Sequence, residues 1–123
     1  MGQGQADLNH HDADDANAGL DRQCGDGAPV ENGFNFYSIT GCVVAYFCHL
    51  YTVQNQRTVW CSASDRAAAS EVITTNCGYY RPGFLEIIVK DHVDGGPDVR
   101  HTVRHGYENY CTDMGQNFCG TGV

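Results

Sequence analysis

The sequence predicts a small all-β protein, an antiparallel β-barrel or sandwich braced by disulfide bonds. Three observations favour this class: seven cysteines in 123 residues, several short β-branched and aromatic runs, and frequent Gly- and Pro-containing turns between them. At most one short helix is expected. A mixed α+β sandwich is the alternative, because residues 64–70 favour a helix.

The first 23 residues differ in composition from the rest of the chain. Five aspartates stand there against one arginine, with no aromatic residue and only two leucines as large aliphatic side chains. Such a segment buries too little apolar surface to offset the entropy lost on ordering. We therefore expect a disordered acidic tail over residues 1–23 and a single β-rich, disulfide-stabilised domain over residues 24–123.

Aromatic and β-branched runs predict the strands of this domain. The clearest lie at 34–39, 43–53 and 84–90, with shorter ones at 58–61 and 99–104. A turn around Gly95 predicts that the runs at 84–90 and 99–104 are antiparallel partners. Residues 64–70 predict one or two helical turns, capped by Ser64, before Val72–Thr75 return to β preference.

Charge and hydropathy exclude two classes of partner. The formal charge is −8 at pH 7, and a surface of this sign repels nucleic-acid phosphates and anionic lipids. The apolar runs fall far short of the roughly 20 residues that a membrane helix needs. We expect no nucleic-acid partner and no membrane segment.

The cysteines indicate an oxidising compartment. None of them forms a CxxC pair, so the short spacing typical of zinc knuckles and redox motifs is absent, and no metal or cofactor is predicted. A disulfide framework remains, which predicts a secreted protein, here in a mature form because the first residues lack a basic, apolar leader. Because the number of cysteines is odd, at least one thiol is free or bonded to a second copy in a homodimer. The seven are Cys24, Cys42, Cys48, Cys61, Cys77, Cys111 and Cys119.

Motifs around the later cysteines carry a family resemblance. Trp60-Cys61-Ser62-Ala63 is followed, 16 residues after Cys61, by Cys77-Gly78, and Tyr110-Cys111 and Phe118-Cys119 come near the end. With Cys24 and the aromatic run at 33–39 upstream, residues 24–119 resemble the Alternaria major-allergen family of secreted fungal proteins. The resemblance implies an antiparallel β-barrel with bridges Cys61–Cys77 and Cys111–Cys119, and a link between subunits through Cys24.

The resemblance also implies a function. Members of the family are similar to effectors and elicitors that act on plant hosts, and they bind host defence proteins or small phenolic ligands without settled catalytic machinery. Cys42 and Cys48 have no counterpart in the family. Six positions apart on one strand, they lie about 20 Å from each other and cannot bond together. Cys24 is therefore a candidate partner for either of them.

One segment has residues suited to catalysis. A small secreted ribonuclease needs two acid–base groups and a cation for the phosphate, which His101, His105, Glu108 and Arg104 could supply. On a strand, however, His101 and His105 share one face and Arg104 points to the other. A ribonuclease-like effector is thus the alternative function, and a charged, solvent-facing strand is the favoured interpretation.

Four tyrosines beside predicted turns are candidate binding residues. They could form a stacking surface for a carbohydrate or a phenol, or pack at the edge of the core. They are Tyr79, Tyr80, Tyr107 and Tyr110. The sequence as a whole predicts a secreted binding protein without enzymatic activity, whose partner is a host plant protein or a small phenolic or carbohydrate ligand.

Overall fold

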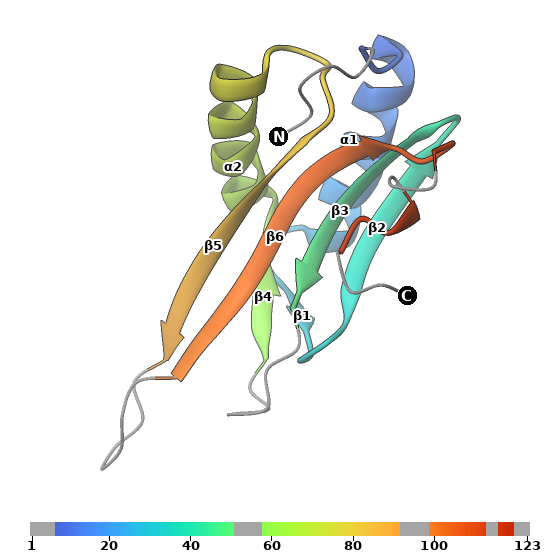
Figure 1. The fold of residues 1–123 in the computed structure, drawn as a ribbon. Helices are drawn as coiled ribbons and strands as arrows, with labels where there is room; N and C mark the ends of the chain where they lie inside the picture. The colour runs from blue at the N-terminus through green and yellow to red at the C-terminus, as the bar shows by residue number, and fades with distance from the viewer. Residues whose placement is uncertain (1–6, 51–57, 92–98, 113–115, 120–123) are drawn as a thin grey trace.

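Two helices pack on one face of an antiparallel four-stranded sheet (Figure 1). The computed structural model describes residues 7–50, 58–91, 99–112 and 116–119. The sheet has the order β2-β3-β6-β5, and β1 and β4 form a separate two-stranded sheet. In chain order the elements are α1 (His10–Cys24), β1 (Ala28–Val30), β2 (Asn35–Thr40), β3 (Val43–His49), β4 (Val59–Cys61), α2 (Ala63–Cys77), β5 (Gly83–Asp91) and β6 (Val99–Asn109).

The predicted fold class was wrong. The described residues form two helices as well as six strands, and neither sheet closes into a barrel. The prediction of at most one short helix was also wrong, because there are two helices of 15 residues each among the described residues. α1 covers β2 and β3, and α2 covers β5 and β6. We call the covered side of the four-stranded sheet the inner face and its opposite side the outer face.

The segment expected to be a disordered tail contains α1. The Asn9 side chain caps this helix by accepting a hydrogen bond from the Asp12 amide at 3.0 Å. Its buried residues recur at helical spacing and face the sheet, while Asp14 and Asp15 are exposed. The buried residues are Ala13, Ala16, Leu20 and Cys24. Three of these four side chains are small or contain sulfur, so a count of large apolar residues misses the stripe.

The predicted short helix is also longer than expected. α2 begins after Ser62, which accepts a hydrogen bond from the Asp65 amide at 3.1 Å, and runs through the β-branched residues Val72–Thr75. Arg66, Ala69 and Ile73 form its buried face. Packing of this face overrides the local β preference of the second half.

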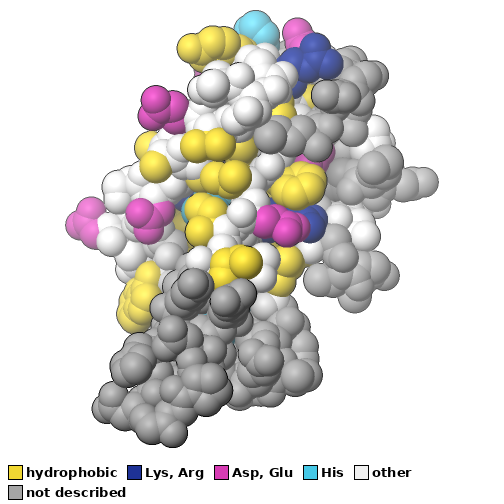
Figure 2. All heavy atoms as spheres, turned by 60° about the vertical axis from the view of Figure 1, so that its left-hand side comes forward, with side chains coloured by type: hydrophobic (Ala, Val, Ile, Leu, Met, Phe, Trp, Pro, Cys, Tyr) yellow, Lys and Arg dark blue, Asp and Glu magenta, His cyan; other side chains and the backbone are white. Residues whose placement is uncertain are grey.

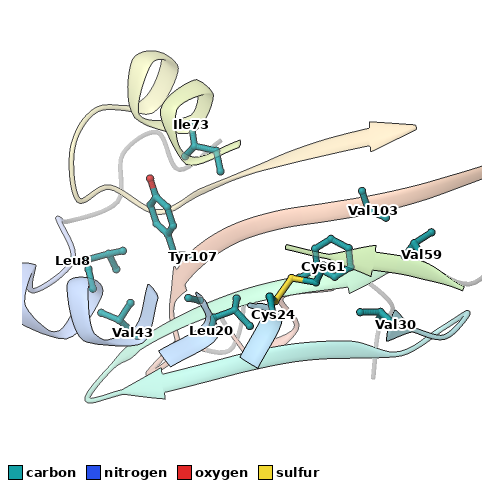
Figure 3. Close-up of a cluster of buried hydrophobic side chains, with 14 residues drawn as sticks. Leu8, Leu20, Cys24, Val30, Val43, Val59, Cys61, Ile73, Val103 and Tyr107 are labelled. Carbon is teal, nitrogen blue, oxygen red and sulfur yellow. A yellow bond between two sulfur atoms is a disulfide. The ribbon is translucent and has the colours of Figure 1, made fainter. Parts of the chain in front are cut away.

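The main core lies between the helices and the inner face of the sheet (Figure 3). Leu8, Leu20, Val43, Val103 and Tyr107 belong to it and come from four segments, since the last two both lie on β6. β3 is buried along its whole length because a second, smaller cluster covers its outer side. There Val44, Tyr46 and Cys48 pack under the C-terminal residues Tyr110, Phe118 and Cys119.

The disulfide pairing differs from the one that the resemblance implied. The bonds are Cys24–Cys61, Cys42–Cys111 and Cys48–Cys119. Cys61 therefore does not bond Cys77, nor Cys111 bond Cys119, and Cys24 bonds neither Cys42 nor Cys48. The odd cysteine is Cys77, which is half-buried and the one described cysteine without a disulfide partner.

Candidate ligand-binding cleft

An apolar cleft of about 740 Å³ opens between α2, β4 and the inner face of β5 and β6. Figure 2 shows the α2 and β5 side of the molecule, where hydrophobic side chains gather. We call this hollow the α2 cleft. Its apolar lining consists of Phe47, Val59, Trp60, Ala68, Ala69, Val72, Leu85, Ile87 and Val103, and its polar lining of Thr58, Asp65 and His105.

Large apolar side chains at the mouth of the α2 cleft face solvent. The exposed fractions are 61% for Trp60, 41% for Val72 and 39% for Ile87. Trp60, the only tryptophan of the chain, points outward from β4 because its neighbours Val59 and Cys61 turn into the core. A group of exposed apolar side chains around a hollow is typical of a binding site.

His105 adds a polar group to this apolar hollow. Its side chain comes from the inner face of β6, is 5% exposed, and meets the Phe47 ring edge-on with centroids 4.9 Å apart. Among the described groups, none forms a hydrogen bond with its Nδ1 atom. Burial, helped by the Arg66 guanidinium and opposed by the Asp65 carboxylate, lowers the pKa of His105 to about 4. The imidazole is therefore neutral near pH 7.

Arg66 supports the base of α2 and ties it to α1. Its guanidinium forms an ion pair with Asp21, and it donates hydrogen bonds to Asn17, at 2.8 Å to Oδ1 and at 3.3 Å to the carbonyl oxygen. The side chain is 7% exposed, and this burial lowers the pKa of Arg66. These contacts hold its charge on the α1 side of α2.

Two further buried histidines link three strands. His49 Nδ1 lies 2.9 Å from the Val30 carbonyl oxygen, which can only accept, so Nδ1 carries the proton. His49 Nε2 then accepts a hydrogen bond from His101 Nδ1 at 2.8 Å. The two rings join β1, β3 and β6 inside the core.

The four residues of the ribonuclease alternative do not form one site. His101 and His105 lie on the inner face of β6, whereas Arg104 and Glu108 lie on the outer face. Arg104 donates to Glu86 and to the Phe118 carbonyl oxygen at 3.1 Å, and its guanidinium carbon lies 4.4 Å from the Phe84 ring centroid.

Glu108 is held in the same outer-face network. Its carboxylate accepts a hydrogen bond from the Tyr46 hydroxyl at 3.1 Å. Burial raises the pKa of Glu108, and burial together with the Glu108 charge raises the pKa of Tyr46. The sheet therefore separates His101 and His105 from Arg104 and Glu108 by its full thickness.

Three of the four predicted tyrosines come together. Tyr79, Tyr80 and Tyr107 line a smaller pocket of about 210 Å³ between α1 and α2. The Tyr80 hydroxyl donates to Asp14 at 3.0 Å, which raises the pKa of Tyr80, and its ring stacks on His10 at 3.8 Å between centroids. Tyr110 lies in the outer-face cluster instead.

Sequence reasoning missed most of the α2 cleft. It placed His105 correctly with His101 on one face of a strand, but it favoured a solvent-facing strand, which was wrong because both histidines are buried. The single exposed tryptophan between two inward residues was a signal for the mouth of the cleft. The wall formed by α2 could not be predicted, because half of that helix was expected to be a strand.

Comparison of the chain with known protein families, with curated proteins and with solved structures finds no match. The open sheet and the disulfide pairing both differ from those that the family resemblance implies. The geometry of the α2 cleft is therefore the strongest basis for a functional proposal.

Proposed function

We propose that this is an extracellular binding protein whose α2 cleft holds a small apolar ligand. The observation that carries the proposal is the cleft itself, a hollow of about 740 Å³ lined mainly by aliphatic and aromatic side chains. This volume lies in the range of pockets for small molecules, roughly 300–1,000 Å³. The exposed Trp60 beside it provides a flat surface on which a ring can stack.

The extracellular setting is supported by the covalent framework. Three disulfide bonds stabilise a small domain, as is usual in oxidising compartments. Within the described residues, no helix has the length and apolar character needed to cross a membrane. An effector or elicitor role in a fungus that meets a plant host is part of this proposal, and it rests on the cysteine motifs alone.

Binding is favoured over catalysis by the placement of the polar residues. A ribonuclease would need acid–base residues from among His101, His105 and Glu108 around one phosphate with Arg104. The two histidines lie on the opposite face of the sheet from Arg104 and Glu108. A small ligand is favoured over a host protein because the apolar surface is hollowed. A phenolic ring suits the cleft better than a carbohydrate, which would leave many hydroxyl groups facing aliphatic side chains.

Fluorescence of a neutral apolar probe tests this proposal. We expect N-phenyl-1-naphthylamine to become brighter on binding and to quench Trp60, the only tryptophan. Ala68→Phe would fill the cleft and weaken probe binding at least about 10-fold, because its new ring occupies the ligand volume. Ala67→Phe is the matched control, since Ala67 is also an exposed residue of α2 but does not line the cleft.

The two variants separate specific binding from surface adsorption. Equal loss in both, or in neither, would show that the probe binds elsewhere and would overturn the proposal. Circular dichroism of both variants checks that α2 is intact.

A further inference from the structure

We propose that the ligand of the α2 cleft is a neutral apolar molecule with one hydroxyl group, which hydrogen-bonds to His105. This inference rests on the proposed function and specifies its ligand class. It follows from the position of the buried His105 ring in an otherwise apolar hollow. Most of the ligand surface is then buried against apolar side chains, and one polar group of the ligand faces the imidazole.

The hydrogen-bonding capacity of His105 defines the polar group. A neutral imidazole has one N–H donor and one bare nitrogen acceptor. The ring lines the cleft and is 5% exposed, and no described group forms a hydrogen bond with Nδ1. A buried polar atom without a partner is unfavourable, because it has lost its hydrogen bonds to water. A ligand hydroxyl can donate or accept, so it suits this ring whichever tautomer is present.

An anionic ligand group does not suit the site. Among the described residues that line the cleft, the one ionised side chain is Asp65, which repels a carboxylate. The nearest cation, Arg66, is already bound to Asp21 and Asn17. A buried carboxylate would therefore lose its hydration without gaining an ion pair.

A cationic ligand group does not suit the part of the α2 cleft beside His105 either. The Arg66 guanidinium contributes to the low pKa of His105 by repelling a positive charge on this ring. The same repulsion acts on an ammonium group placed beside the ring. The Asp65 carboxylate opposes this repulsion, but its effect on a positive charge at the ring is smaller than that of Arg66.

The apolar wall defines the rest of the ligand. Val72, Leu85 and Ile87 present aliphatic surface from both sides of the hollow, with Trp60 at the mouth. A phenol or a hydroxylated hydrocarbon meets both requirements, because its body is apolar and its only polar group is the hydroxyl. We therefore assign the cleft to this class.

Matched naphthalene derivatives test the assignment by calorimetry and Trp60 quenching. We expect 2-naphthol to bind the wild-type protein roughly 3- to 10-fold more tightly than naphthalene or 2-methoxynaphthalene, as one hydrogen bond allows. The charged analogues 2-naphthoate and 2-naphthylmethylammonium should bind more weakly than 2-naphthol. In His105→Phe, which keeps an aromatic ring, 2-naphthol and naphthalene should bind within about 2-fold of each other.

The outcomes distinguish this inference from the proposed function. If naphthalene and 2-naphthol bind the wild type equally, or if either charged analogue binds most tightly, the hydroxyl assignment is overturned and the cleft remains a binding site. If none of these compounds binds, the proposed function falls as well. Should His105→Phe fail to fold, the five-ligand series on the wild type decides the assignment by itself.

Discussion

Three histidines lie buried in the core. His49, His101 and His105 are each 5% exposed or less. For His105 the consequence for stability has a definite sign. Its pKa is about 4 in the folded protein, against 6.5 for the free side chain, so the unfolded chain binds more protons between these values. Its contribution is complete above about pH 6.5 and is lost as the pH falls toward 4.

The first prediction concerns acid stability. Lowering the pH from 7.5 to 4.5 should reduce the free energy of unfolding by about 2–3 kcal/mol through His105 alone. Urea unfolding followed by circular dichroism measures this loss. His105→Phe should lose less over the same interval, whereas His11→Gln should match the wild type, because the His11 side chain is 83% exposed. An unchanged loss in His105→Phe would contradict the assignment.

The second prediction concerns Gly106, where the strands approach closely. A Cβ atom there would lie 2.6 Å from both the Gly83 carbonyl oxygen and the Tyr46 hydroxyl. Gly106→Ala should therefore lower the free energy of unfolding by about 1–3 kcal/mol, because the backbone must shift. Thr102→Ala, on the same strand without such crowding, is the control. Equal urea midpoints for Gly106→Ala and the wild type would show that the strands can separate at no cost.

At the scale of elements, the longer strands were predictable, whereas α1 was missed and α2 was predicted only over its first half. The aromatic run at 34–39 and the aliphatic run at 84–90 fall on β2 and β5 within a residue or two. Runs of aromatic and aliphatic residues indicate a strand directly, because they depend on local burial alone. α1 was missed because its buried stripe consists largely of alanines among aspartates, and only packing against β2 and β3 shows that it is a core helix.

The third prediction follows from this correction. Leu20 is fully buried in α1, so Leu20→Ala should cost about 2–4 kcal/mol in the free energy of unfolding. A disordered tail would have made this substitution neutral. Asp15→Ala, at an exposed position of the same helix, should change stability by less than about 0.5 kcal/mol. Urea titrations of both variants decide the matter, and similar small effects would restore the view of a tail.

Across the whole molecule, the three disulfides join segments that are distant in the chain. Cys24–Cys61 ties α1 to β4, while Cys42–Cys111 and Cys48–Cys119 tie the C-terminal segment to the β3 side of the sheet. Local motifs could not predict these pairs, because each cysteine bonds a residue at least 37 positions away. The odd number of cysteines did predict that one is left over.

The fourth prediction concerns this framework. Peptide mapping without reduction should recover the three pairs and an alkylated Cys77. The double variant Cys48→Ser/Cys119→Ser should lose about 2–4 kcal/mol of unfolding free energy, because the unfolded chain regains the entropy of a long loop. Cys77→Ser should unfold close to the wild type. A recovered Cys61–Cys77 peptide would contradict the described pairing.

β6 provides the floor of the α2 cleft with one set of side chains and the outer-face ionic network with the other. His105 belongs to the first set, and Arg104, its neighbour in the chain, belongs to the second. The side chains of β6 thus alternate between the two faces with a period of two residues. Substituting a single residue alters one face, but inserting or deleting one would exchange the two faces at once. Substitutions on the inner face of β6 can therefore change the lining of the α2 cleft without altering the outer face. Insertions and deletions within β6 would disrupt both faces.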